Sequence, residues 1–152
     1  MGKLARFLGF GDGRRDLVDD LALSYRAEME QAALLRAQAE RARYPQMADE
    51  LRRLAAQEDV HAADILAHIR SLGGAEPFVE RPVVAGKNNW ERLVAARHAA
   101  QRKRQRMVEQ VAHWDPDEPA AVALLGRIEQ EDVAAIPAYD ALIMRSDPQA
   151  LD

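Results

Sequence analysis

The sequence predicts an all-α protein, an antiparallel four-helix bundle built from two helical hairpins joined by a long crossover loop. Three observations support this prediction. Ala, Leu, Arg, Glu and Gln dominate the composition and only 5% of residues are aromatic, a mixture that favours helices over strands. Apolar residues recur at the three-four spacing of a buried helical face over long stretches. Between these stretches lie Pro and Gly residues of the kind that end helices.

Four helices are expected from this spacing, each roughly 25 residues and about 40 Å long. The second ends at the pair Gly73 and Gly74, and the fourth begins near Pro119, since proline suits the first turn of a helix. Asn88 or Asn89 is a suitable N-cap for the third. The predicted helices cover residues 16–43, 46–72, 88–113 and 119–145.

The connection between the second and third helices is much longer than the other two. It covers residues 73–87 and contains Pro77, Pro82 and Gly86. A loop of about 15 residues without its own secondary structure is uncommon and needs a structural reason. In a four-helix bundle that reason is often a crossover along the length of the bundle. A weak repeat agrees with two equivalent hairpins, because the sequence QEDV at residues 57–60 recurs at 130–133.

The length of 152 residues fits one folded domain with short extensions. We assign residues 16–146 to a four-helix domain and residues 147–152 to a C-terminal tail. Residues 1–15 form an N-terminal amphipathic segment of mixed apolar and basic side chains. Packing on the bundle or on a second subunit is its default role, and docking to a partner, a shell or a membrane surface is the alternative.

Composition excludes several classes of function. The chain has no cysteine, which rules out disulfides, thiolate metal sites, iron–sulfur clusters and cysteine nucleophiles. A net charge of -4 argues against nucleic acid as the main partner. No stretch approaches the roughly 18 consecutive apolar residues of a transmembrane helix. The N-terminus has too short an apolar core for a secretory signal, so we expect cytoplasmic residence.

Acidic side chains and one histidine fall on the predicted interior faces. On the second helix, the step from Leu54 to Ile65 requires two interior residues, and Glu58 and His61 take these positions. An unpaired carboxylate in a bundle interior is strongly unfavourable. A metal ion would neutralise the carboxylate and accept the imidazole nitrogen, because side chains three residues apart on a helix are neighbours. The interior stripe of the first helix adds Glu28. The interior stripe of the fourth helix adds Glu131, and it reads Leu124, Ile128, Glu131, Ala135, Ala138 and Leu142.

This set of residues resembles the ferritin-like di-metal proteins of the rubrerythrin type. Those proteins take a Glu from each of two helices and a Glu-x-x-His from each of the other two. Here Glu28 resembles the first-helix Glu, and Glu58 with His61 resembles the first Glu-x-x-His. The resemblance covers roughly residues 16–145 and implies the metal ligands Glu28, Glu58, His61 and Glu131.

The second half-site departs from that pattern. The repeat puts Gln101 where a second Glu is expected and Ala134 where a second His is expected, so Glu131 retains only its carboxylate. His98, one turn before Gln101, is a candidate additional ligand, and Tyr25 is a candidate hydrogen-bond donor beside the site. Ordinary packing or hydrogen bonding is the alternative role for both.

The resemblance implies a protein that binds iron or manganese, with zinc as a further option, as one or two ions. It implies a role in iron handling, oxidation or peroxide removal, and a homo-oligomer, dimer or larger. The absence of cysteine removes the rubredoxin-like electron-transfer module of some rubrerythrins.

The alternative is a metal-free helical bundle with a decayed site that serves in interaction or assembly. In this alternative, a basic side chain of the third helix takes the place of the metal. An inward Arg97 or Arg104 would neutralise the carboxylates. We expect these basic residues to form a solvated face instead. A nucleic-acid surface is a third, weaker interpretation. The basic residues are Arg97, Arg102, Lys103, Arg104 and Arg106.

Overall fold

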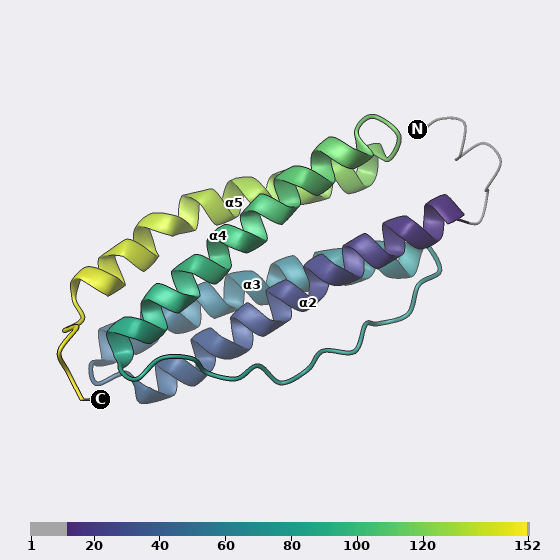
Figure 1. The fold of residues 1–152 in the computed structure, drawn as a ribbon. Coiled ribbons are helices and arrows are strands. Elements are labelled where there is room, and N and C mark those ends of the chain that lie inside the picture. Colours follow the sequence, from purple (N-terminus) through teal and green to yellow (C-terminus); the bar gives the residue numbers. More distant parts are fainter. Residues whose placement is uncertain (1–11, 152) are drawn as a thin grey trace.

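The computed structural model describes residues 12–151, so our predictions for residues 1–11 lie outside the described part. Figure 1 shows long helices lying side by side, each antiparallel to the helices it packs against. No strand occurs within residues 12–151, and no helix there is long and apolar enough to cross a membrane. The predicted all-α bundle is confirmed. The helices are α2 (Asp12–Arg41), α3 (Pro45–Ser71), α4 (Asn89–Trp114) and α5 (Pro119–Met144).

The helix ends follow local residue chemistry. Pro45 and Pro119 open α3 and α5, where a missing N–H has no effect on the helical hydrogen bonds. The Asn88 side chain caps α4 by accepting a hydrogen bond from the backbone N–H of Glu91 at 2.8 Å. Helix α2 begins at Asp12, four residues before the start at residue 16 that we predicted.

Residues 72–88 cross the bundle from the end of α3 to the start of α4, running along its length (Figure 1). Two hydrogen bonds attach this crossover to α2. The Tyr25 hydroxyl donates to Glu76 Oε1 at 3.0 Å, and Arg26 Nε donates to the carbonyl oxygen of Phe78 at 3.0 Å. The predicted crossover between two hairpins is therefore confirmed, with α2 and α3 forming one hairpin and α4 and α5 the other.

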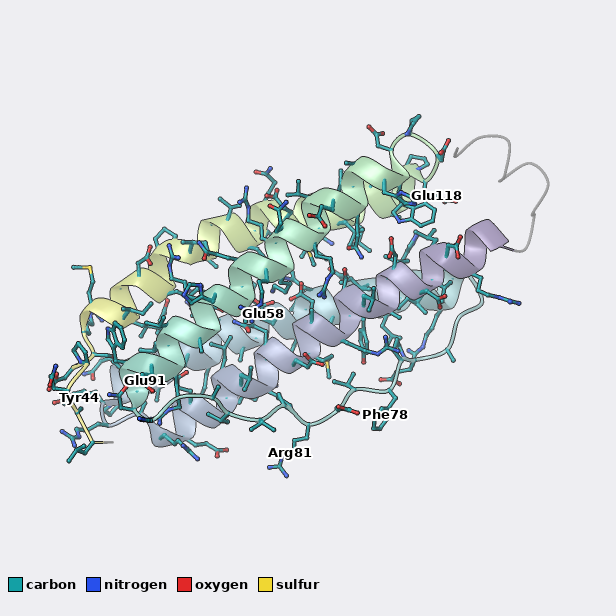
Figure 2. All side chains as sticks on the ribbon, in the orientation of Figure 1. Tyr44, Glu58, Phe78, Arg81, Glu91 and Glu118 are labelled. Carbon is teal, nitrogen blue, oxygen red and sulfur yellow. The ribbon has the colours of Figure 1, made fainter. Side chains whose placement is uncertain are left out.

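The apolar core is divided into two clusters by a polar layer. One cluster gathers around Leu54 and Tyr139, and the other around Ile65 and Trp114. Glu58 lies between them, near the middle of the bundle (Figure 2). The interior of this protein is thus interrupted at the place where the sequence predicts a metal site.

The register of α5 differs from our prediction. Leu125, Asp132 and Tyr139 point inward, whereas we expected Leu124, Glu131 and Ala138. Either set gives a four-three alternation together with Ile128, Ala135 and Leu142, which are interior in both. The spacing of apolar residues alone therefore does not distinguish the two registers. The buried alternation is Ala121, Leu125, Ile128, Asp132, Ala135, Tyr139 and Leu142.

Candidate metal centre

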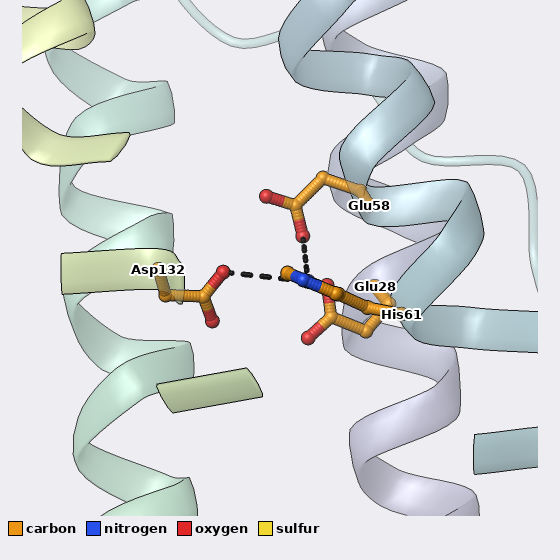
Figure 3. A group of neighbouring side chains, drawn as sticks. All are labelled: Glu28, Glu58, His61 and Asp132. Carbon is orange, nitrogen blue, oxygen red and sulfur yellow. Dashed lines mark ion pairs between the residues drawn. The ribbon is translucent and has the colours of Figure 1, made fainter. Parts of the chain in front are cut away.

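Each of the four helices contributes to one buried polar cluster. Its members all have relative exposures of 4% or less. One donor atom from each of the cluster's three acids and its histidine lies within 4.8 Å of the others. Figure 3 shows the side chains from α2 and α3 facing the one from α5 across the bundle. The cluster comprises Glu28 of α2, Glu58 and His61 of α3, Lys103 of α4 and Asp132 of α5.

The inner nitrogen of His61 faces three carboxylates without hydrogen-bonding any of them. His61 Nδ1 lies 3.7 Å from Glu28 Oε2, 3.9 Å from Glu58 Oε2 and 3.5 Å from Asp132 Oδ1. Hydrogen bonds between nitrogen and oxygen are shorter than these separations. Ligand atoms that share one ion, each about 2 Å from it, stand about 3 to 4 Å apart. The spacing is that of donors arranged around a common cation.

The outer nitrogen of the same ring has a carboxylate partner. His61 Nε2 lies 2.6 Å from Glu131 Oε2, and the Glu131 side chain is 41% exposed at the rim of the bundle. Metal-binding histidines usually donate their second ring N–H to such a group, which fixes the ring and aims the other nitrogen at the metal. Glu131 therefore orients His61 from outside the cluster. Our prediction of an inward Glu131 is wrong, and Asp132 holds the interior position.

Lys103 supplies the positive charge inside the cluster. Its Nζ contacts Glu58 Oε2, lies 2.7 Å from Glu28 Oε2 and lies 3.4 Å from Asp132 Oδ1. We expected Lys103 on a solvated basic face, and this prediction is wrong. Arg97 and Arg104, which we considered as inward partners, instead pair with Asp140 and Glu129 at 2.5 and 2.8 Å near the surface.

The electrostatics of the two basic groups follow from burial and charge. Burial lowers the pKa of Lys103, but the carboxylates of Glu28, Glu58 and Asp132 outweigh it and hold that pKa above its usual range. Burial likewise lowers the pKa of His61, and the surrounding carboxylates, Glu28 first, raise it to about 10. Both groups are therefore cationic partners of the acids at neutral pH.

The three interior acids respond differently to the same environment. Burial raises the pKa of Glu28 to about 8 and that of Asp132 to about 6. Burial also raises the pKa of Glu58, but the neighbouring Glu28, His61 and Lys103 lower it to about 2. Glu58 is thus the carboxylate that stays charged most readily, whereas burial makes Glu28 and Asp132 easier to protonate.

Three atoms of the cluster that could bind a metal ion have no hydrogen-bond partner within the described part of the chain. Glu28 Oε1, His61 Nδ1 and Asp132 Oδ2 are buried and have no hydrogen-bond partner among residues 12–151. Buried polar atoms without partners are uncommon in folded proteins and unfavourable. An ion bound by these atoms would satisfy them.

These donors are fewer than a two-ion centre uses. A two-ion centre of this architecture uses four carboxylates and two histidines. Here α4 contributes the ammonium of Lys103 in place of a carboxylate, and the only imidazole in the cluster is His61. Glu28, Glu58, His61 and Asp132 remain, and three carboxylates with one imidazole are enough for a single ion.

Other predicted residues do not join the cluster. His98 and Gln101 are exposed on α4, so neither is a ligand or a neighbour of the cluster. Tyr25 is buried one turn from Glu28, but its hydroxyl donates to Glu76 in the crossover rather than to the cluster.

Two signals in the sequence point to the residues that we missed. Lys103 belongs to a regular three-four alternation along α4 that identifies it as an interior residue. On α5, Tyr139 is a much larger apolar side chain than Ala138, and placing it inward turns Asp132 inward as well. The alternation on α4 is Leu93, Ala96, Ala100, Lys103, Met107, Gln110 and Trp114.

Two antiparallel hairpins, a lengthwise crossover and carboxylates with a histidine buried at mid-bundle define a ferritin-like protein. The family model described as Rubrerythrin matches residues 19–117, and the chain belongs to this family. The predicted fold and resemblance are confirmed.

The fold is also similar to a solved bacterioferritin from Rhodobacter capsulatus. The TM-score is 0.76 at 16% sequence identity, and the match covers 86% of this chain and 84% of that one. That bacterioferritin is described with a metal-free dinuclear site and a heme iron. Comparison with curated proteins finds no match.

Proposed function

We propose that the protein binds a single divalent metal ion, iron or manganese, through Glu28, Glu58, His61 and Asp132. Membership of the Rubrerythrin family supports iron, while the donor types also accept manganese and zinc. The observation that carries the proposal is the orientation of His61. Its outer nitrogen is held by Glu131, and its inner nitrogen is aimed at three carboxylates without a hydrogen bond.

A purely structural histidine would not need this arrangement. A ring that only filled space would place both nitrogens against hydrogen-bond partners, because an unpaired buried nitrogen is unfavourable. In this cluster one ring nitrogen is left over and three carboxylate oxygens lie 3.5 to 3.9 Å from it. A metal ion at this point would displace a proton from His61 and bring the carboxylates together.

A bound iron would supply one-electron chemistry toward dioxygen or peroxide, which suits the oxidation or iron-handling role that we expect from the family. The chain's own contribution is to hold the ion in a dry interior. Glu131 keeps the ring of His61 in place, and the apolar clusters on either side limit access of water.

Elemental analysis and Fe(II) titration under anaerobic conditions test the proposal. We expect one ion per chain in the wild type and none bound tightly in Glu58→Ala or His61→Ala. His68→Ala, on the same helix outside the cluster, and Glu80→Ala, exposed in the crossover, serve as matched controls. The proposal fails if the wild type binds no ion after loading, or if the controls lose the ion as the site variants do.

A second function is favoured by Lys103. Its ammonium already contacts three carboxylates, so the cluster is stable as a metal-free polar layer. In that case the protein is a helical bundle for interaction or assembly. The same titration separates the two functions, since absence of binding in the wild type supports this second one.

Assembly and location belong to the same proposal. We infer a homo-oligomer of cytoplasmic residence from the family and from the fold shared with a bacterioferritin. Light scattering during size-exclusion chromatography measures the oligomeric state directly, and a mass of one chain would contradict the inference.

A further inference from the structure

Lys103 and a metal ion would compete for the same oxygen atoms. The Nζ of Lys103 contacts Oε2 of Glu28 and Oε2 of Glu58. These are the two glutamate oxygens that lie nearest to His61 Nδ1. An ammonium and a metal cation cannot both sit against these atoms, because two like charges at such short range repel strongly in a buried site.

Lys103 has space to leave the cluster. A cavity of about 200 Å³ opens between α2 and α4, and Lys103 forms part of its wall. Glu30 and Gln31 also line this cavity, so it offers a carboxylate and an amide oxygen to an ammonium. Arg102 and Arg106 line it as well, and both are exposed residues of α4. A water molecule occupies about 30 Å³, so the volume accommodates an ammonium group with its hydration.

We propose that Lys103 is a displaceable internal cation, which holds the carboxylates together before metal binds and moves into the α2–α4 cavity when an ion takes its place. This inference rests on the proposed single-ion site. The lysine side chain is suited to the exchange, because it is a long flexible stem that carries a compact charge. Before and after the exchange a cation lies against Glu58, first the ammonium of Lys103 and then the divalent ion.

The exchange makes the apparent metal affinity lower than the donors alone would give. Part of the free energy of metal binding is used to break the ion pairs of Lys103. The chain with Lys103 in the cluster cannot bind the ion, and a protein that is mostly in such a state has a lower apparent affinity. Replacing Lys103 by an uncharged residue of similar length removes the competitor. The ion is then bound more tightly, and its number per chain stays at one because no ligand has been added.

The first experiment compares Zn(II) affinity in wild type, Lys103→Met and Lys87→Met, using competition with a metal indicator. Lys87 is exposed, so its variant is a matched control. We expect the affinity of Lys103→Met to rise about tenfold or more, with that of Lys87→Met unchanged. Lys103→Arg, which keeps the charge, should bind no more tightly than wild type. Unchanged or weaker binding by Lys103→Met overturns the inference.

The second experiment needs no variant and so does not depend on the folding of Lys103→Met. Wild-type protein is treated with an amine-acetylating reagent with and without Zn(II), and modified lysines are identified by mass spectrometry. We expect Lys87 to react in both conditions and Lys103 to react only with Zn(II), because displacement brings its Nζ to the cavity. Protection of Lys103 in both conditions, with Zn(II) bound, overturns the inference.

The outcomes separate this inference from the proposed function. If neither wild type nor Lys103→Met binds Zn(II) or Fe(II), the single-ion site itself is wrong and the inference falls with it. If wild type binds one ion and the two readouts on Lys103 are negative, the site stands and only the displacement is wrong.

Discussion

Glu131 and Asp132 are adjacent acids on α5, but their side chains point in different directions and make different contacts. Asp132 points into the bundle, where its carboxylate faces His61 and Lys103. Glu131 points to the rim, where its carboxylate contacts the outer nitrogen of His61 and lies 3.5 Å from a guanidinium nitrogen of Arg127. The side chains of consecutive helical residues point in different directions. Asp132 is therefore a candidate ligand, whereas Glu131 at the preceding position orients the proposed ligand His61.

Glu131→Gln should weaken metal binding roughly 10- to 100-fold, because the loss of the carboxylate leaves His61 less firmly oriented and less basic. The number of ions bound should not change, since the four donors remain. Isothermal titration with Zn(II) measures both quantities. Glu109→Gln, exposed on α4, is the matched control, and equal affinity for wild type and Glu131→Gln would show that the rim contact does not act on the site.

The helices differ in how far their interiors could be predicted from the sequence. On α2 and α3 the predicted stripes are buried as expected, because Glu28, Glu58 and His61 stand among apolar residues at unambiguous spacing. On α4 we treated Lys103 as one of five basic residues with a common solvated role. The three-four alternation along α4 marks its position as interior. The carboxylates that make a buried ammonium favourable come from the partner helices, and that pairing is not visible in the pattern of one helix.

The start of α4 is stabilised by Asn88 in two ways. Its side-chain oxygen caps the helix, and its Nδ2 donates to the carbonyl oxygens of Pro148 and Ala150 at 3.0 and 3.1 Å. Asn88→Ala should lower the free energy of unfolding by about 2 kcal/mol, the sum of a lost cap and lost hydrogen bonds. Urea denaturation measures the change.

Asn88→Asp separates the two contributions, since it keeps the capping oxygen and loses the amide donor. We expect Asn88→Asp to keep more than half of the stability that Asn88→Ala loses. If Asn88→Asp were as unstable as Asn88→Ala, the bonds to the C-terminal segment rather than the cap would be the main contribution.

Two glycines offer opposite tests of backbone conformation. Gly126 lies inside α5, and a Cβ added there meets no atom within 4 Å, so Gly126→Ala should stabilise the protein by about 0.5 to 1 kcal/mol. Gly86 has φ +116, and a Cβ there would come within 2.8 Å of the backbone nitrogen of Arg92. Gly86→Ala should therefore be destabilising. Thermal unfolding of both variants checks the signs, and a stable Gly86→Ala would contradict this account of the crossover.

At the scale of the whole molecule, the polar cluster divides the hydrophobic core into two parts, and the four helices meet there. Each helix contributes at least one charged side chain to this layer. Its charges must balance for the two apolar clusters to pack around it, since a buried charge without a partner is strongly unfavourable. The stability of the bundle therefore depends on Lys103 whenever metal is absent.

Lys103→Met should lower the free energy of unfolding of the metal-free protein by about 3 to 5 kcal/mol, the usual effect of removing one partner from a buried ion pair. Saturating Zn(II) should restore more stability to this variant than to wild type, because the ion then supplies the missing charge. Urea titrations with and without Zn(II) measure both effects. Equal stability of metal-free wild type and variant would mean that the carboxylates are neutral without the lysine.

The position of Lys103 in the middle of the bundle also has a consequence for how the chain folds in the cell. Because the ammonium of Lys103 already pairs with the buried carboxylates, we expect the chain to fold without metal. We also expect a chelator to remove an ion from the proposed site without unfolding the bundle. Small metal-dependent domains, by contrast, fold only when loaded. For the proposed site, we therefore expect the supply of metal to govern occupancy of the site rather than survival of the fold.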